Sequence, residues 1–320
     1  MYNSGMGEHF GGVRVRVPAT AANLGPGFDV LGLALTLYNT FTVAPSDVLC
    51  IEVEGYGVDL PRDESNLFYQ AFKYHWERGG TSMPVPPVQI RMKIEVPPGK
   101  GLGSSATAVV GGLVAANAMV GHYAGESLFE AEMLLAQAVR LERGNHADNV
   151  APALLGGLVV NAHDPLADKH TALIVPFPEE LRVVLLTPDF AMDTVQGRAL
   201  MPSHYSKEDV VYNTSRVALL LSALQTRRYD LLGLAMQDKM HQAYRSQVFR
   251  MMPALIRIAL DCGAYGACLS GGGSSILALT GVEHAEGVGA GMLEAARAPG
   301  VGGEVRVLEA DPAGAKATLL

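Results

Sequence analysis

The sequence lacks several features that mark large classes of proteins. It contains only 3 cysteines, Cys50, Cys262 and Cys268, an odd number without metal-ligand spacing, which excludes a disulfide framework and a cysteine-based metal site. Charged residues make up only 18% of the 320 residues, and the 24 basic residues are outnumbered by 32 acidic ones, with no basic stripe. Because nucleic-acid binders usually carry such a stripe, no nucleic-acid partner is expected.

A membrane segment and a targeting signal are also lacking. Glycine, proline or a charge interrupts each apolar stretch before it reaches the length of a membrane span, so no membrane partner is expected. The first residues, MYNSGMGEHFGG, lack the basic start and apolar run of a signal peptide, and residues 1–12 are expected to form a mobile leader. Together with the unpaired cysteines, these features predict a cytoplasmic protein.

Apolar residues, by contrast, are abundant. They make up 49% of the chain, which is enough for a sizeable core and excludes the disordered class. The first periodic run alternates Val13, Val15 and Val17 with Arg14 and Arg16. That alternation predicts a strand with one buried face.

Periodicity and breaker residues predict two domains. Strands are expected over residues 30–37, 40–44, 49–54, 88–96 and 158–161, and helices over 66–78, 104–119 and 127–140. The stretch NAHDPLADKHTA is typical of a connection, which places a boundary near residue 165. A strand, helices, two strands, a helix and a strand follow, in the order of a ferredoxin-like sandwich. The expected fold class is α+β, with domains over residues 13–165 and 166–320.

The stretch PPGKGLGSSATA, residues 97–108, is the strongest candidate for a phosphate-binding loop. A P-loop is excluded because Lys100 is followed by Gly101 rather than by serine or threonine. Residues 101–106 satisfy the G-x-G-x-x-A pattern of dinucleotide-binding folds, but Glu126, at the required distance, heads a helix instead of ending a strand. A third interpretation is a loop that binds phosphate through N–H groups at a helix N-terminus. A plain glycine-rich turn with a serine cap explains the motif alone equally well.

Two further motifs decide between these interpretations. PATAANLGPGFDVLGLAL precedes the loop at residues 18–35, and GACLSGGGSSILAL follows it at 266–279. In this order, the three motifs resemble the signatures of the GHMP small-molecule kinases, which phosphorylate galactose, homoserine, mevalonate and phosphomevalonate. The third motif departs from the commoner LSGAGP[ST] at Gly272 and Ser274, which keep the loop small. The resemblance implies a two-domain GHMP-kinase-like fold, with an N-terminal mixed sheet with helices that binds ATP and a C-terminal ferredoxin-like α/β sandwich.

The resemblance also implies where ATP and Mg²⁺ bind. The implied ATP-binding residues are Pro97, Pro98, Gly99, Lys100, Gly101, Leu102, Gly103, Ser104, Ser105, Ala106 and Thr107. Ser105 and Glu142 are the implied Mg²⁺ ligands, and Glu132 stays open as an alternative because some relatives have a longer spacing. Lys100 either contacts phosphate or is solvated.

Four details resemble the homoserine branch of the family. They are Asn23 and Asp29 in ANLGPGFDVLG, the element HADNVAPALLGG at residues 146–157, Thr194 followed by Arg198, and HQAYR ending at Arg245. The resemblance implies the substrate-binding residues Asn23, Asp29, His146, Asn149, Thr194, Arg198, Arg245 and Gly271.

The chemistry of homoserine agrees with these residue types. Arg198 and Arg245 suit its carboxylate, because a guanidinium fork binds a carboxylate bidentately, and Asp29 suits its ammonium. Asn23 and Asn149 are the implied catalytic residues, which orient the hydroxyl; no residue is an obvious general base. Asp148, between two pocket residues, is interpreted as a helix N-cap.

The expected activity is the ATP-dependent phosphorylation of L-homoserine to O-phospho-L-homoserine in threonine biosynthesis. Another kinase of the same family, with a different alcohol as substrate, and a non-catalytic nucleotide-binding regulator on the same fold are the alternatives. The phosphate and metal residues argue against the regulator. Because members of the family are often dimeric, a homodimer is expected.

Overall fold

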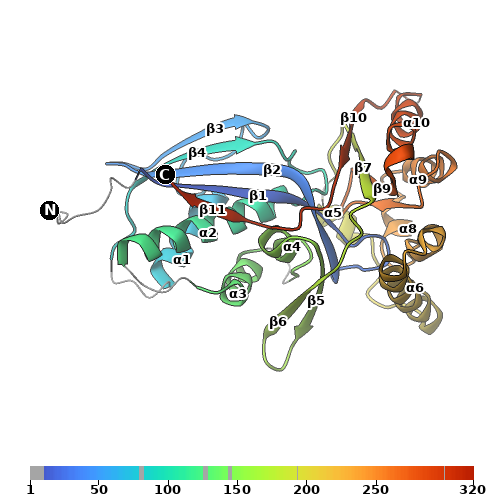
Figure 1. Cartoon of the computed structure of the whole chain (residues 1–320), viewed down its shortest axis with the longest axis horizontal. Coiled ribbons are helices and arrows are strands. Elements are labelled where there is room, and N and C mark those ends of the chain that lie inside the picture. Colours follow the sequence, from blue (N-terminus) through green and yellow to red (C-terminus); the bar gives the residue numbers. More distant parts are fainter. Residues whose placement is uncertain (1–10, 79–82, 125–128, 143–145, 193, 299) are drawn as a thin grey trace.

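The computed structural model describes residues 11–78, 83–124, 129–142, 146–192, 194–298 and 300–320, which form two β-sheets side by side (Figure 1). Most of the leader expected at residues 1–12 lies outside the described residues. Its last two residues pair with the other end of the chain: the N–H of Gly11 donates to the carbonyl of Leu320, and the N–H of Leu320 to that of Gly12.

The first sheet is mixed, and the described residues contribute seven strands to it. They are β1 (Val13–Ala22), β2 (Leu31–Pro45), β3 (Cys50–Gly55), β4 (Val88–Ile94), β5 (Leu158–Asp164), β6 (Lys169–Val175) and β11 (Lys316–Leu319). The order is β11-β1-β2-β4-β3, and β5 pairs with both β2 and β6. Only β3 and β4 run parallel among the strand pairs of the described residues. The two strands expected over 30–37 and 40–44 form one long strand, which bulges opposite Pro18 and Ala19.

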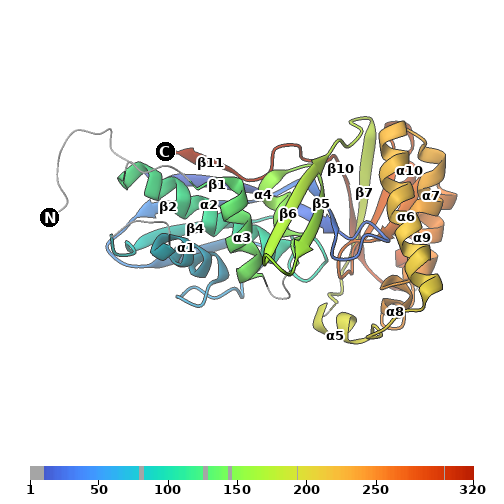
Figure 2. The ribbon, with the colours of Figure 1, turned by 90° about the horizontal axis from the view of Figure 1, so that it is seen from below.

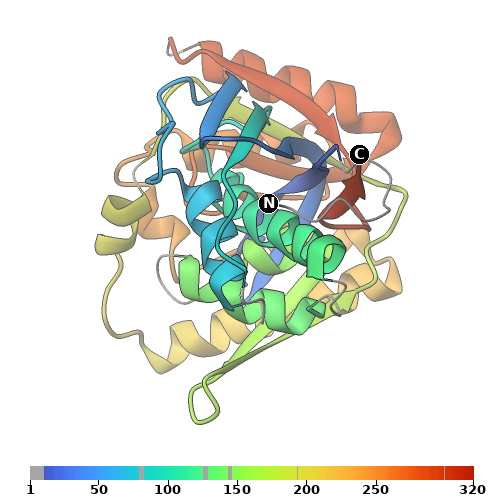
Figure 3. The same ribbon diagram turned by 90° about the vertical axis from the view of Figure 1, so that its left-hand side faces the viewer.

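Helices of the described residues cover one face of this sheet (Figures 1 and 3). They are α1 (Leu67–Arg78), α2 (Ser104–Ala124), α3 (Ala131–Leu141) and α4 (Val150–Leu155). Val13, Val15 and Val17 point into the core beneath them and Arg14 and Arg16 face solvent, as the alternation predicts.

Helix α2 lies at the centre of this layer. By length and composition its residues Ser104–Tyr123 could cross a membrane, but 67% of the apolar window is buried inside the protein, as expected of a core helix. A Cβ on Gly112 would overlap the carbonyl oxygen of Phe68, so the glycine lets α1 approach α2 closely.

The second sheet is antiparallel and has the ferredoxin-like order β10-β7-β9-β8. Its strands are β7 (Leu181–Pro188), β8 (Gly266–Leu269), β9 (Ile276–Gly281) and β10 (Gly303–Leu308). The helices of this half are α5 (Thr194–Ala199), α6 (Lys207–Thr226), α7 (Leu232–Ala235), α8 (Gln242–Arg245), α9 (Met252–Asp261) and α10 (Ala285–Arg297), with 3₁₀ turns η1 (Tyr229–Leu231) and η2 (Val282–His284) (Figure 2). The predicted α+β class and ferredoxin-like half are confirmed.

The predicted boundary at residue 165 does not separate the two sheets. The stretch interpreted as a connection forms the β5–β6 hairpin of the first sheet, and after the second sheet the chain returns to add β11 beside β1. One apolar cluster joins Leu31 and Leu33 of the first sheet to Leu185 and Leu277 of the second. The two sheets therefore share a core.

Candidate active site

A cleft with a volume of about 720 Å³ lies at the glycine loop and is lined by residues of the second and third motifs. The first motif contacts the loop through the N–H of Thr20, but Asn23, Asp29 and Arg245 are not among the residues that line the cleft. Residues of the loop at 98–105 line it together with Glu142, His146, Asn149, Arg198, Gly271 and Gly272. The structure thus brings together residues that are far apart in the sequence. Pro97, Lys100, Ala106 and Thr107 of the predicted loop do not line the cleft.

The loop is built from three glycines in left-handed conformation. Gly99, Gly101 and Gly103 have φ angles of +69°, +72° and +66°, and α2 begins directly after them. The other two motifs bind carbonyl groups of the loop: the N–H of Thr20 donates to Leu102, and the hydroxyl of Ser270 donates to Gly101 at 2.7 Å. With its carbonyls held by the protein, the loop leads into an exposed helix N-terminus, which favours an anion.

Lys100 makes a contact that neither expectation included. Its ammonium group donates to the carbonyl of Pro188 at 2.6 Å, at the end of β7, and burial lowers the pKa of the lysine. Lys100 therefore ties the loop to the second sheet. The contact could not be predicted because it joins residues 88 positions apart.

Ser105 and Glu142 lie together at the cleft. The Ser105 hydroxyl donates to Glu142 Oε1 at 3.3 Å, because the first turn of α2 and the residue that ends α3 meet there. Glu132, the alternative ligand, pairs instead with Lys169 of β6 at 2.5 Å, and both side chains are exposed. Two adjacent hard oxygen donors suit Mg²⁺, so the residues present at Ser105 and Glu142 fit the ion.

Asp29 and Arg198, assigned to opposite ends of the substrate, bind each other. Both terminal nitrogens of Arg198 donate to the carboxylate, at 2.9 and 2.7 Å. Asp29 raises the pKa of Arg198, and the guanidinium also lies 5.0 Å from the centre of the Phe28 ring. The side chains are 30% and 40% exposed, so the pair remains accessible.

Arg245 belongs to a buried network and is only 2% exposed. Its NH1 donates to the carbonyl of Gly271 at 2.9 Å and to His241 Nδ1 at 2.8 Å. Because His241 accepts at Nδ1, its Nε2 carries the hydrogen and donates to the carbonyl of Gly25. Burial lowers the pKa of both residues. Arg245 Nε is buried without a hydrogen-bond partner in the described part of the chain.

Asp238 holds this network in place. Its carboxylate accepts from the backbone N–H groups of Met240, His241 and Gln242 and from the side chain of Asn213. The sequence assigned no role to Asp238, or to His241 at the start of HQAYR. Only the i, i+4 spacing of His241 and Arg245 could have indicated the pair.

Asn23 and Asn149 differ in their surroundings. Asn23 is 3% exposed and has φ of +73°; its amide donates to Gly271 and accepts from the N–H of Asp29, so it links the first and third motifs. Asn149 lines the cleft and accepts at Oδ1 from the Thr20 hydroxyl at 2.8 Å. Thr20 was missed as well. Thr194 begins α5, but its side chain lies outside the described structure.

Asp148 does not cap α4 as interpreted. Asn149 occupies the cap position and makes no capping hydrogen bond with its side chain, while the carboxylate of Asp148 contacts His146 at 3.1 Å. Asp148 raises the pKa of His146, opposed by burial.

The lining of the cleft also includes the apolar residues Leu60, Pro61, Leu67, Met92 and Ile94, together with the polar residues Asn39, Ser65 and Asn66. None of these residues could be identified from the sequence, because they belong to no motif.

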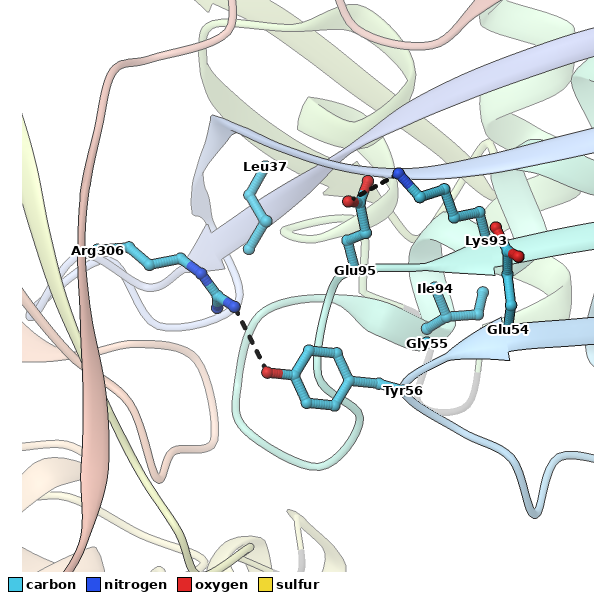
Figure 4. A pocket seen from close by; sticks show the side chains of 8 residues that line it. All are labelled: Leu37, Glu54, Gly55, Tyr56, Lys93, Ile94, Glu95 and Arg306. Carbon is cyan, nitrogen blue, oxygen red and sulfur yellow. Dashed lines mark hydrogen bonds and ion pairs between the residues drawn. The ribbon is translucent and has the colours of Figure 1, made fainter.

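A second cavity, of about 730 Å³, lies between β10 and the ends of β3 and β4 (Figure 4). Its charged residues are mostly paired: Lys93 with Glu95 at 3.0 Å, and Arg306 with Glu304 at 2.6 Å and with the hydroxyl of Tyr56. No residue of the three motifs lines it. The cleft at the glycine loop is therefore the candidate active site.

Comparison with known proteins agrees with this choice. The profile of the GHMP kinases N terminal domain matches residues 66–157, and that of the GHMP kinases C terminal matches residues 220–298. The chain is 42% identical over 306 residues to a homoserine kinase of Desulfitobacterium hafniense, covering 95% of this chain and 99% of the relative. A homoserine kinase of Trichormus variabilis is 42% identical over 95% of this chain and 98% of its own. The crystal structure of a homoserine kinase from Cytophaga hutchinsonii superposes with a TM-score of 0.86 at 30% identity, covering 99% of this chain and 100% of that one.

Proposed function

We propose how the cleft brings ATP and homoserine together, starting from the family of the protein. This chain belongs to the GHMP kinases, in the branch of the homoserine kinases. The chain transfers a phosphoryl group from ATP to the hydroxyl of homoserine, a step of threonine biosynthesis. The cleft lined by the second and third motifs carries the proposal, together with the hydrogen bond by which Thr20 of the first motif holds the loop.

The phosphates of ATP bind the loop at residues 99–105, and the base packs against apolar residues that line the cleft. The left-handed glycines and the free N-terminus of α2 support the first assignment, because N–H groups there bind anions. The apolar lining by Met92 and Ile94 supports the second, because apolar walls with few polar groups suit a nucleobase.

Ser105 and Glu142 hold Mg²⁺. Their 3.3 Å contact at the edge of the cleft and their oxygen donors support this assignment over Glu132, which is paired with Lys169 outside the cleft. When bound, the ion neutralises charge on the phosphates. Replacing Glu142 with Gln is expected to weaken the Mg²⁺ dependence of ATP binding in calorimetry, whereas Glu132→Gln leaves it unchanged.

Homoserine binds between Arg245 and the Asp29–Arg198 pair. The buried Nε of Arg245 without a partner supports a ligand carboxylate at this point, because an unsatisfied charged donor is costly. Asp29 accepts the ammonium group, and Arg198 turns from Asp29 toward the carboxylate. His146 and Gly271 complete the wall of this site, and Thr194 is assigned to it on the resemblance alone.

Asn149 orients the attacking hydroxyl. Its amide lines the cleft next to Gly103 and is fixed by Thr20, which supports a positioning role. The amide of Asn23 already holds Gly271 and Asp29, so Asn23 contributes through the shape of the site. Phosphoryl transfer depends on alignment and charge neutralisation more than on a strong base, which agrees with the residues present.

The test is ADP formation with Mg-ATP and homoserine, mevalonate, galactose or shikimate. Turnover with homoserine alone is expected. Turnover with another of these alcohols would favour a different member of the family, and ATP binding without turnover would favour a regulator. Those two outcomes correspond to the alternatives that the sequence left open.

A homodimer in the cytoplasm completes the proposal. The edge strand β6 and its turn expose Leu166 (98%), Leu173 (65%) and Ile174 (55%), which supports pairing between two copies. Free Cys50, Cys262 and Cys268 support a reducing compartment. Light scattering of the wild type and of Leu173→Lys tests the dimer, and an unchanged mass would remove β6 from the interface.

A further inference from the structure

We propose that Asp148 is a positioning residue for phosphoryl transfer, whose buried carboxylate fixes His146 and Asn149, two side chains that line the cleft. The inference rests on the homoserine site proposed above. It adds a residue that reaches the substrate only through its two neighbours.

One oxygen atom of Asp148 contacts both side chains. Oδ1 accepts from Asn149 Nδ2 at 3.4 Å and lies 3.1 Å from His146 Nδ1. Because a carboxylate only accepts, Nδ1 carries the hydrogen, and Nε2 of His146 is left for other partners. The Asp148 side chain is 4% exposed, so water competes little for these contacts.

The amide of Asn149 is held at both ends. The Thr20 hydroxyl donates to its Oδ1 at 2.8 Å, and Asp148 accepts from its Nδ2. An amide held in this way cannot exchange its oxygen and nitrogen. The acceptor hydroxyl therefore meets a donor and an acceptor in defined positions. Since a displacement of about 1 Å can cost about 100-fold in rate, a residue that fixes Asn149 contributes to kcat.

Asp148 also influences the charge of His146. The imidazole is faced by Asp148 from its own loop, Asp29 from the turn after β1, Arg198 from α5 and His170 from β6. The hydrogen bond to Asp148 is the strongest of these influences, and the pKa of His146 rises despite burial. A protonated His146 places a positive charge at the cleft, where the transferred group is negative.

The first test measures the contact between Asp148 and His146 in the absence of substrate. Histidine labelled with ¹³C at Cε1 is titrated by NMR in the full chain, with the His146 signal assigned through His146→Gln. We expect a pKa above about 6.5 in the wild type and a clearly lower one in Asp148→Asn. Equal values in the two proteins, or a wild-type value below about 6.5, would overturn the proposal. Because no homoserine is present, this failure is distinct from failure of the proposed substrate site.

The second test is kinetic. Asp148→Asn is expected to lower kcat about 10- to 100-fold, to leave KM for ATP within about threefold, and to move the basic limb of the kcat/KM profile to lower pH. If kcat fell but the basic limb of the kcat/KM profile stayed at the pH of the wild type, Asp148 would have a merely structural role. That result would contradict the proposal.

Two further variants complete the experiment. Asp168→Asn is the matched control, because Asp168 lies 3.5 Å from His163 at the exposed hairpin; its kcat and pH profile should equal those of the wild type. Thr20→Val releases the other end of Asn149 and is expected to lower kcat about tenfold. An unchanged kcat in Thr20→Val would show that holding the Asn149 amide at both ends does not matter for the rate. This would contradict the proposal even if Asp148→Asn failed to fold.

Discussion

At the residue scale, the polar side chains in and around the cleft are largely paired with one another. Asp29 binds Arg198, Arg245 binds His241 and Gly271, and Asn23 binds Gly271. Buried charges require partners, and here the protein supplies them before a substrate arrives. When homoserine binds, we therefore expect some of these side chains to replace a hydrogen bond within the protein by one to the substrate.

Replacing Arg245 with Ala tests this exchange. We expect KM for homoserine to rise about 10- to 150-fold, because one charged hydrogen bond is worth about 1.5–3 kcal/mol, while KM for ATP stays within about threefold. The measurement is steady-state kinetics with each substrate varied in turn.

The matched control for this variant is Arg250→Ala, since Arg250 follows α8 closely and is exposed. It should leave both KM values unchanged. Equal losses for homoserine and ATP in Arg245→Ala would show that the variant damages the whole cleft, and the carboxylate role would then be dropped.

At the element scale, the glycine loop depends on close packing against β1 as much as on its approach to a nucleotide. A Cβ on Gly103 would overlap the hydroxyl of Thr20 and lie 3.1 Å from Asn149 Oδ1, and its φ is +66°. Gly103→Ala is expected to lower the free energy of unfolding by about 2 kcal/mol. Because Thr20 and Asn149 must move, kcat should fall at least about tenfold. Urea denaturation and kinetics measure the two effects.

Gly287 in α10 is the matched glycine, since a Cβ there meets nothing within 4 Å. Gly287→Ala should raise the free energy of unfolding by about 0.5–1 kcal/mol and leave kcat unchanged. If Gly103→Ala behaved like Gly287→Ala, the close packing of the loop against Thr20 would be unimportant.

The helix layer contains a buried histidine that makes stability depend on pH. His75 on α1 is fully buried, its Nδ1 lies 2.7 Å from Gln137 Oε1 on α3, and burial lowers its pKa. Its folded pKa is below the unfolded value of about 6.5, so its contribution to stability is complete above that pH and is lost as the pH falls through the folded pKa.

His75→Gln removes this titration and is expected to flatten the decrease in unfolding free energy below about pH 6.5. Urea denaturation at several pH values measures the slope. His204→Gln, at an exposed site, should keep the slope of the wild type. The same slope in all three proteins would mean that His75 titrates normally.

Local patterns in the sequence predicted the elements better than their contacts. The alternation of Val13 to Val17 and the three glycine motifs predicted β1 and the cleft. Strand β6 was missed because its edge position exposes Leu173 and Ile174 on neighbouring positions, so no alternation marks it. Pairings such as that of Thr20 with Asn149, 129 residues away, leave no local pattern at all.

At the scale of the whole molecule, the chain leaves the first sheet, builds the second and returns. Tyr38 of β2 donates to Asp311 at 2.6 Å, which fixes the returning segment, and burial together with the Asp311 carboxylate raises the pKa of Tyr38 to about 12. We therefore expect that the halves divided at residue 165 do not fold separately.

Fragments 13–165 and 166–320 test this conclusion. The first fragment lacks β6 and β11, which pair with β5 and β1. The second fragment carries these two strands without their partners, and its own sheet loses the apolar side chains of Leu31 and Leu33 that share its core. We expect neither fragment alone to unfold cooperatively in urea, followed by circular dichroism. A mixture of the two should regain a cooperative transition. Cooperative unfolding of either fragment by itself would restore the boundary at 165.

The pairing of β1 with β11 has one more consequence. The N–H of Gly11 donates to the carbonyl of Leu320 at 2.9 Å, so the two ends of the described chain are neighbours. Proteins whose ends meet in this way tolerate circular permutation. A short linker could close the chain there, and new ends could be opened at the turn of the β5–β6 hairpin, where Leu166 is 98% exposed. The order of elements along the gene could then be rearranged without changing which strands lie side by side.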